Sequence, residues 1–395
     1  MDLDAFRWLL TDDGQQLLSE ASPADGAGPD DELALQADLR KRATAAQVAT
    51  ALTQVELRRR AEPKFGELAA RMYFTHAGLE QATRLPVAKH RAGRLQAAVT
   101  TSLIDLGCGI GGDLIASAAA GITTAGVDLD PVRVAVAEAN LAALDLPGAV
   151  AVADATTVDT SPFDTAFADP ARRSGRGRTF SPDGWTPPWS FVEDLLLARP
   201  SCVKVAPGIP HDLVPDGVEA EWVSDHGEVK EACLWSGRLR TTVRRATVIG
   251  RGGLATITDE DAPSPGEDGA GVRPVGDYLY EPDGAVVRAG LVTAVAAGVE
   301  GGLLDEHIAY VVSDRSFRTP FARGYRVVEE LPYREKQLKA ALRERGVGTL
   351  TIKKRGVSVS PDALRQRLGL RGDVTATLVL TRAAGHGTAL LVEPF

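Results

Sequence analysis

Short apolar runs alternate with longer helical patterns through the middle of this 395-residue chain. The runs have strand length and lie at residues 103–104, 124–127, 149–152, 165–167, 202–205 and 233–235. Strands that alternate with helices form mostly parallel sheets covered by helices. We therefore predict an α/β domain over residues 96–257.

Different patterns flank this domain. Residues 21–31 are rich in proline, glycine and aspartate and separate two helical patterns, so residues 1–95 are expected to be a helical region. Residues 258–276, with three prolines, four glycines and five acids, have the composition of a linker. Residues 277–395 mix short strands and helices and end in alternating strands, which predicts a second domain.

A glycine-rich turn follows the first strand of the α/β domain. It reads Asp105-Leu106-Gly107-Cys108-Gly109-Ile110-Gly111-Gly112 and precedes a helical pattern from Leu114 to Ala120. Glycine accepts positive φ and, without a Cβ, lets the backbone approach a ligand closely. Asp128 ends the next strand, about 20 residues later, where an acid can bind ribose hydroxyl groups. The pattern predicts a site for a nucleotide-type cofactor.

Two classes of cofactor compete for this turn. Gly107, Gly109 and Gly112 satisfy the spacing of a dinucleotide-binding turn. Asp105 argues against a dinucleotide, because its carboxylate would repel a pyrophosphate at the helix N-terminus. S-adenosylmethionine has no phosphate and carries an ammonium and a sulfonium group, so an acidic turn suits it.

The turn and the next strand end, Gly126-Val127-Asp128, resemble the class I S-adenosylmethionine-dependent methyltransferase family. The resemblance implies a Rossmann-like sheet and S-adenosylmethionine as the cofactor. It also implies a set of cofactor-binding residues, which are Asp105, Gly107, Gly109, Gly111 and Asp128, with Asp154 as a further candidate.

The fourth strand ends at a candidate catalytic motif, Asp169-Pro170-Ala171-Arg172-Arg173. Open α/β sheets bind ligands at this edge. Asp169-Pro170 resembles the start of the Asp-Pro-Pro-Tyr motif of methyltransferases that act on exocyclic amines. In that motif the carboxylate and the adjacent carbonyl accept hydrogen bonds from the amine, and the aromatic residue stacks on the base. Ala171 and Arg172 depart from the motif, so a simple Asp-Pro turn is the alternative.

Arginine and tryptophan follow this motif. Arg172 and Arg173 are candidate substrate-binding residues, because arginine pairs with phosphate groups. Trp185 and Trp189 suit base stacking, and hydrophobic packing of a long loop is the other explanation for them.

The resemblance extends along residues 60–395. Lys64-Phe65, 72–75 and 78–84 resemble the helical lead-in of the trimethylguanosine synthase group of RNA cap methyltransferases. The whole chain is similar to bacterial methyltransferases with a C-terminal THUMP-like domain, through residues 169–173, 280–290 and 353–356. This similarity implies an α+β THUMP-like domain at 277–395 that helps to hold RNA, with Lys353, Lys354 and Arg355 contacting the substrate.

Charge divides unevenly along the chain. The net charge of −9 disfavours a nucleic-acid partner, but residues 326–371 contain 12 Lys and Arg against 5 Asp and Glu, a local charge of +7. Such a block can bind phosphates or can be a solvated surface.

Composition points to a cytoplasmic protein without membrane contact. No apolar run approaches the ~18 residues of a membrane span, and the N-terminus lacks the features of a signal peptide. The widely spaced Cys108, Cys202 and Cys233 form neither a disulfide framework nor a zinc pattern. No metal site is expected.

These features together predict an S-adenosylmethionine-dependent methyltransferase that methylates a nitrogen of an RNA base. Asp169 and the Pro170 carbonyl would orient the target amine. One alternative is a methyltransferase of small molecules or proteins, which the acidic pI of 5.3 favours. Another is a non-catalytic RNA-binding module with a degenerate cofactor pocket, which the missing aromatic residue favours.

Overall fold

The computed structural model describes residues 1–22, 29–172, 184–263 and 271–395, with the backbone alone at 29–32 and 171–172. The chain forms two compact units. Unit 1 consists of Met1–Val205, Ile209–Val218 and Cys233–Thr241, and unit 2 of Ala206–Gly208, Glu219–Ala232 and Thr242–Phe395. The chain passes between the units more than once, so neither is a single continuous stretch.

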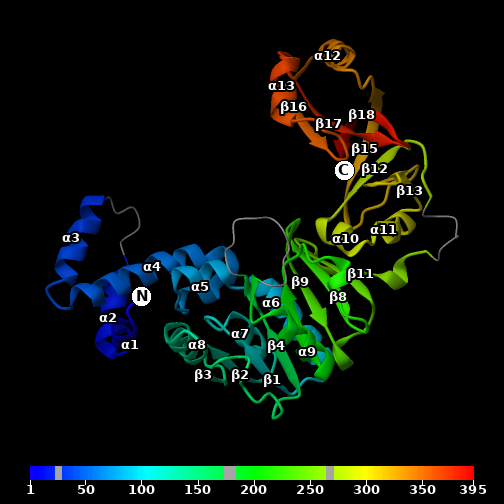
Figure 1. Ribbon diagram of the computed structural model, residues 1–395. Helices are drawn as coiled ribbons and strands as arrows, with labels where there is room; N and C mark the ends of the chain where they lie inside the picture. Colours follow the sequence, from blue (N-terminus) through cyan, green and yellow to red (C-terminus); the bar gives the residue numbers. More distant parts are fainter. Residues whose placement is uncertain (23–28, 173–183, 264–270) are drawn as a thin grey trace. The chain divides into compact units, whose positions relative to one another are not determined.

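Helices make up the N-terminal part of unit 1, as predicted (Figure 1). They are α1 (Leu3–Leu9), α2 (Asp12–Glu20), α3 (Pro29–Leu39), α4 (Ala45–Phe65), the 3-10 helix η1 (Gly66–Ala70), α5 (His76–Gln81) and α6 (Leu85–Ala97). The helical pattern predicted before residue 21 forms two helices rather than one. Thr11 ends the first and caps the second, because its side chain accepts a hydrogen bond from Gly14 N.

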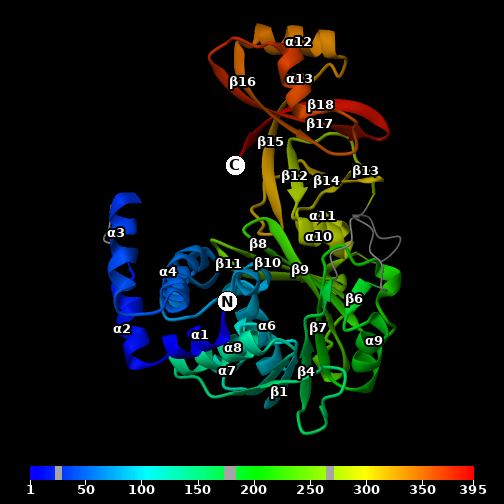
Figure 2. The ribbon, with the colours of Figure 1, turned by 60° about the vertical axis from the view of Figure 1, so that its left-hand side comes forward.

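A hydrophobic core joins these helices to the glycine turn. Phe6 of α1, Leu57 and Phe65 of α4, and Phe74 pack in one cluster with Ile110 of the turn. Helix α1 also contacts α8 (Pro131–Ala143), and both views show the two helices close together (Figures 1 and 2). Because Ile110 belongs to this core, packing of the N-terminal helices holds the turn in place.

Five parallel strands form the sheet of unit 1, in the order β7-β4-β1-β2-β3. Their bounds are β1 (Ser102–Leu106), β2 (Thr123–Asp128), β3 (Ala149–Val152), β4 (Thr165–Ala168) and β7 (Ser201–Val205). Helix α7 (Gly112–Ala119) joins β1 to β2, α8 joins β2 to β3, and α9 (Trp189–Ala198) precedes β7. Strands β5 (Ala171–Arg172) and β6 (Trp185–Thr186) pair separately. The strand order reverses at β1, so the carboxyl ends of β1 and β4 flank the expected ligand site.

Three further strands of unit 2 were not predicted. They are β8 (Glu219–Asp225), β10 (Arg244–Gly250) and β11 (Gly253–Thr258), and β9 (Glu228–Trp235) passes from unit 2 into unit 1. Strand β8 is buried along its whole length although it carries Glu219 and Glu221. Glu219 pairs with Arg245, and Glu221 accepts a hydrogen bond from Thr247, both on β10.

The C-terminal part of unit 2 is an α+β domain with a seven-stranded sheet in the order β13-β14-β12-β15-β18-β17-β16. The strands are β12 (Tyr278–Pro282), β13 (Gly302–Asp305), β14 (Ile308–Ser313), β15 (Ala322–Leu331), β16 (Val347–Lys354), β17 (Val374–Ala383) and β18 (His386–Pro394). The helices are α10 (Gly284–Ala289), α11 (Val292–Gly298), α12 (Glu335–Glu344) and α13 (Pro361–Leu368). Short 3-10 turns elsewhere are η3 (His211–Leu213), η4 (Gly237–Leu239) and η5 (Asp259–Asp261).

Part of the predicted linker at 258–276 is structured. Val272 forms a parallel bridge with Leu303, and Arg273 N donates to the Leu303 carbonyl over 2.8 Å. The domain boundaries proposed from the sequence remain predictions. Among the described residues, no helix combines the length and apolar character needed to cross a membrane.

Candidate active site

The glycine turn leaves β1 and enters α7. Gly107, Gly109 and Gly111 have φ values of 107°, 56° and 84°, which favour glycine at all three positions. A Cβ on Gly111 would lie 3.3 Å from Ala137, whereas nothing lies within 4 Å of the same position on Gly109. The backbone at Gly109 therefore borders open space, and Gly111 allows α8 to approach the turn.

Asp128 holds this turn through its carboxylate. Oδ2 accepts a hydrogen bond from Gly109 N over 3.0 Å, and Oδ1 accepts one from Asp130 N over 2.9 Å. Arg133 lies 3.8 Å from Oδ2. The acid is 9% exposed, so it stands at the edge of the turn with lone pairs left for a ligand hydroxyl group.

Asp105 is the buried acid beneath the turn. Its side chain is 1% exposed, and its Oδ1 has no hydrogen-bond partner among the described residues. Burial raises the pKa of Asp105 well above its usual range, and the nearby Asp113 and Asp169 raise it further, although Arg91 opposes them. Buried polar atoms are nearly always paired in native proteins. A cationic donor such as the ammonium group of S-adenosylmethionine fits this position.

Asp154 follows β3 at the same edge of the sheet. The neighbouring Ala153 donates its N–H to the Asp128 carbonyl over 3.2 Å. Asp154 is exposed, and its Oδ1 accepts hydrogen bonds from the backbone and the hydroxyl group of Thr156, which lower its pKa. One carboxylate oxygen therefore fixes a local turn, and a cofactor role for the other remains a prediction.

Asp169 directly follows β4, as predicted, and its carboxylate is paired. Lys204 Nζ, on the neighbouring β7, lies 2.5 Å from Asp169 Oδ2 and also donates to Thr83 Oγ1 over 3.3 Å. A Cβ on Gly107 would lie 3.9 Å from the Asp169 main-chain oxygen, so the acid stands beside the glycine turn. In the sequence, Lys204 ends its strand in a way that resembles several methyltransferases, but the sequence does not distinguish a site role from a structural one.

Asn140 is a residue that the sequence pattern did not indicate. Its Nδ2 donates to the carbonyls of Ile110 and Tyr73 over 2.9 and 3.0 Å, and its Oδ1 accepts from Tyr73 N over 2.6 Å. It is fully buried on α8 and ties the glycine turn to the segment before α5. It is also the chain's only asparagine, a rarity that could have drawn attention to it.

The segment after Asp169-Pro170 contains two more predicted residues. Arg172 is described by its backbone alone and Arg173 lies outside the described residues, so their substrate role remains a prediction. Trp185 and Trp189 are 5% and 7% exposed, and their ring centroids lie 5.2 Å apart at 85°. Trp185 of β6 and Trp189 at the start of α9 are thus buried against each other, as the packing explanation predicts.

Burial raises the pKa of the Cys108 thiol inside the glycine turn. Cys108, Cys202 and Cys233 are all buried free thiols. Reactive cysteines need access to solvent, so the burial of these thiols argues against a nucleophilic role.

The three basic candidates of the C-terminal domain differ in their surroundings. Lys353 Nζ lies 2.5 Å from Glu281 Oε2. Arg355 donates to the Ala309 carbonyl over 2.6 Å and lies over a tyrosine ring. Lys354 is exposed. Two of the three side chains are thus held by contacts inside unit 2.

Comparisons with known proteins agree with this geometry. THUMP domain-like sequences match residues 322–394, and a domain of unknown function matches residues 2–61. Two curated relatives, from different strains of Mycobacterium tuberculosis, are described as uncharacterised S-adenosylmethionine-dependent methyltransferases. Each is 39% identical over 353 residues, covering 86% of this chain and 95% of the relative.

A crystal structure from Porphyromonas gingivalis, described as that of a methyltransferase, matches the whole fold. It covers 99% of this chain and 97% of its own, with a TM-score of 0.73 and 21% identity. The parallel sheet and its glycine turn define a Rossmann-like methyltransferase fold. The chain belongs to the S-adenosylmethionine-dependent methyltransferases, with S-adenosylmethionine as its cofactor and a THUMP-like domain at its C-terminus.

Proposed function

We propose that this enzyme methylates a nitrogen of an RNA base. The observation that carries the proposal is the place of Asp169, at the carboxyl end of β4 and beside Gly107 of the glycine turn. A target group held by Asp169 would lie next to the cofactor site. When bound, S-adenosylmethionine supplies an electrophilic methyl group on a positively charged sulfur.

The chain's own contribution is to position the target amine. Lys204 binds Asp169 Oδ2 and fixes the orientation of the carboxylate through a charge-assisted hydrogen bond. Asp169 Oδ1 and the Pro170 carbonyl are then available to accept hydrogen bonds from an amino group. Alignment of this kind supplies a large part of the rate enhancement in transfer reactions.

Two features support RNA as the substrate. The match to THUMP domain-like sequences covers most of the C-terminal domain. The segment from Lys64 to Arg84 resembles the lead-in of the trimethylguanosine synthase group. In the structure, Lys64 donates to the carbonyls of Leu79, Glu80 and Ala82 and so caps the end of α5.

The test is methyl transfer from labelled S-adenosylmethionine to total RNA, followed by mass spectrometry of the nucleosides. We expect a base-methylated nucleoside with the wild-type protein. Asp169→Ala, which removes the hydrogen-bond acceptor, should lower transfer about 100-fold while cofactor affinity changes little. Full activity in this variant would remove the amine-directed mechanism and return Asp169-Pro170 to a structural turn.

A second candidate is a cofactor-binding protein that holds RNA without transferring the methyl group. The Asp169–Lys204 pair favours it, because one carboxylate oxygen is already occupied by a side chain of the same protein. The same assay decides between them, since this candidate binds S-adenosylmethionine and RNA but gives no labelled nucleoside.

A further inference from the structure

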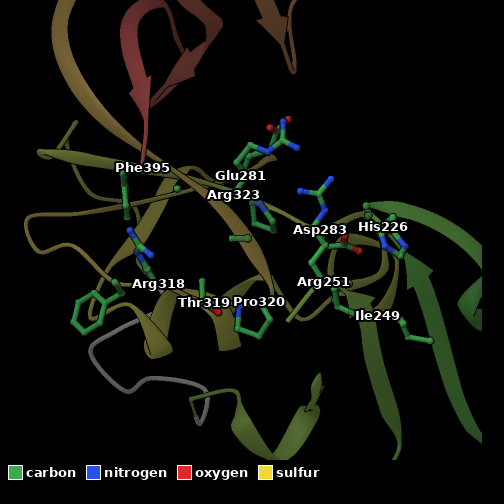
Figure 3. A pocket seen from close by; sticks show the side chains of 18 of the residues that line it. His226, Ile249, Arg251, Glu281, Asp283, Arg318, Thr319, Pro320, Arg323 and Phe395 are labelled. Atoms are coloured by element: carbon green, nitrogen blue, oxygen red, sulfur yellow. The ribbon is translucent and has the colours of Figure 1, made fainter. Parts of the chain in front are cut away.

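Unit 2 contains a cavity of about 1080 Å³, and its lining includes Lys353 and Arg355, two of the residues predicted to contact the substrate. Its walls come from the β8–β9 turn, the end of β10 and the turn after it, the β12–α10 junction, the segment from Phe317 to Gly324, the end of β16, and Phe395 (Figure 3). The volume lies at the upper end of ordinary ligand pockets. The cavity has room for several groups of a ligand.

The charged side chains that line the cavity are mostly basic. Arginine and lysine contribute five positive charges, and glutamate and aspartate contribute two negative charges, which leaves +3 from these side chains. The basic residues are Arg251, Arg318, Arg323, Lys353 and Arg355, and the acids are Glu281 and Asp283. His226 also lines the cavity, and its Nδ1 lies 2.7 Å from the buried carboxylate of Asp225.

Both acids and two of the cations make contacts within unit 2. Glu281 pairs with Lys353, and Asp283 caps α10 by accepting a hydrogen bond from Ala285 N over 2.8 Å. Arg355 is held by a backbone carbonyl and lies 5.1 Å from the centre of the Tyr310 ring. Lys353 offsets the charge of Glu281, whereas the capping hydrogen bond leaves the charge of Asp283 in place. One negative charge therefore remains against the three other arginines.

Three of the five lining cations remain, and they are Arg251, Arg318 and Arg323. All three are exposed, and within the described part of the chain their side chains make no hydrogen bond or ion pair. They come from three separate places: the β10–β11 turn, the β14–β15 loop and the start of β15 (Figure 3). A concentration of positive charge around one cavity produces a positive potential that attracts anions.

An aromatic residue lies on the same wall. Phe395 is 40% exposed, and its ring lies against the backbone of Gly324, where a Cβ would come within 2.5 Å of it. Guanidinium groups bind phosphate oxygens in pairs, and an exposed ring offers a surface for a nucleobase. This combination fits a phosphate-bearing ligand with bases attached.

We propose that this cavity binds the phosphates of single-stranded RNA through Arg251, Arg318 and Arg323. The choice of RNA over a small phosphorylated molecule rests on the proposed function. The cavity then holds the strand by its backbone, and recognition of the target base is left to the site at Asp169.

The experiment measures binding of a mixed-sequence single-stranded RNA to the full-length protein at several salt concentrations. The cavity variant carries Arg251→Gln, Arg318→Gln and Arg323→Gln. The control variant carries Arg7→Gln, Arg40→Gln and Arg59→Gln, which remove the same charge from exposed arginines outside both the cavity and the basic block at 326–371. Cofactor affinity and melting temperature are measured for both, to show that each variant is folded.

Each phosphate contact on a single strand contributes about 0.7 to the slope of log affinity against log salt. Loss of three contacts should flatten the slope by about 2 and weaken binding at low salt by at least about tenfold. The control should stay close to the wild type. Unchanged binding in the cavity variant, or an equal loss in both variants, would overturn the inference.

Competition distinguishes the two sources of phosphate. Inorganic phosphate and a nucleoside monophosphate should displace RNA only at millimolar concentrations. A different result would overturn this assignment and replace RNA by a small ligand. In that result the wild type binds the monophosphate at micromolar concentration but does not bind RNA, and the cavity variant loses the monophosphate binding. Methyl transfer is measured separately. If the cavity variant keeps both normal RNA affinity and normal RNA methylation, the cavity proposal is wrong and the proposed function stands.

Discussion

Lys204 Nζ lies 2.5 Å from Asp169 Oδ2, across the parallel pair formed by β4 and β7. The two residues are 35 positions apart in the chain, and adjacency of their strands brings them together. Asp169 is 32% exposed and Lys204 is 16% exposed, so the pair stands at the edge of the site rather than in the core. Lys204 is therefore a candidate positioning residue for the predicted catalytic acid.

Replacement of Lys204 should separate binding from turnover. Lys204→Met keeps the length of the side chain but frees the Asp169 carboxylate, so we expect kcat to fall about 100-fold through misalignment. The KM for S-adenosylmethionine should change little, and Lys204→Arg should restore part of the rate. Lys89→Met, at an exposed site on α6, is the control. If Lys204→Met lowers the melting temperature as well as the activity, and Lys204→Arg restores neither, the pair is a structural ion pair.

Removal of the Asp128 carboxylate should weaken the cofactor site. Asp128→Ala loses the predicted ribose contact and also the hydrogen bonds from Gly109 N and Asp130 N. Loss of a hydrogen bond to a charged group costs ~1.5–3 kcal/mol, so affinity for S-adenosylmethionine should fall about 10- to 150-fold in calorimetry.

A neighbouring acid provides the control for this change. Asp130→Ala removes the cap of α8, where Asp130 Oδ1 accepts from Val132 N over 2.8 Å, at a cost of about 1 kcal/mol of stability. Cofactor affinity in Asp130→Ala should stay near the wild-type value. A similar loss in both variants would show that loosening of the loop, rather than a ribose contact, causes the effect at Asp128.

Asn140 should contribute strongly to stability. Asn140→Leu leaves the Ile110 carbonyl and both backbone groups of Tyr73 without their partners in a buried site. Each unpaired buried group costs about 1–3 kcal/mol, so we expect a loss of at least about 2 kcal/mol in denaturant unfolding. Gln96→Leu, which removes an exposed side-chain hydrogen bond, should stay within about 0.5 kcal/mol. A loss that small at Asn140 would contradict its bridging role.

Local patterns predicted the cofactor half of the fold well. β1, the glycine turn, α7 and β2 are contiguous in the chain, and each is specified by residues within a few positions of one another. β8 was missed because its glutamates break the apolar pattern. Their partners Arg245 and Thr247 are 26 residues away, so only the fold shows that these acids are paired.

The basic block at 326–371 shows a second limit of prediction from the sequence. Several of its cations are paired with acids from inside and outside the block, in the pairs Arg326–Glu393, Arg345–Glu329, Lys353–Glu281, Arg365–Asp362 and Arg367–Glu335. The cavity arginines without a partner in the described part of the chain, Arg251, Arg318 and Arg323, all lie outside it. A count of charges along the chain cannot distinguish paired from unpaired groups, because pairing depends on the fold.

The raised pKa of Asp105 predicts that cofactor binding depends on pH. Burial, with Asp113 and Asp169 nearby, favours the protonated form of Asp105 in the free protein. A bound ammonium group favours the ionised form, so binding must release a proton wherever Asp105 is protonated beforehand. Affinity for S-adenosylmethionine should therefore rise with pH and level off above the raised pKa.

Calorimetry in buffers of different ionisation enthalpy measures this proton release directly. At a pH below the raised pKa of Asp105, the wild type should release up to one proton for each cofactor bound. Asp105→Asn keeps the size of the side chain but cannot ionise, so it should bind more weakly and lose this proton release. The structure also contains Asp128 at the turn, and Asp128→Asn should retain the release because Asp105 is intact. A pH-independent affinity in the wild type, or proton release that persists in Asp105→Asn, would show that Asp105 does not bind the cofactor's cationic group.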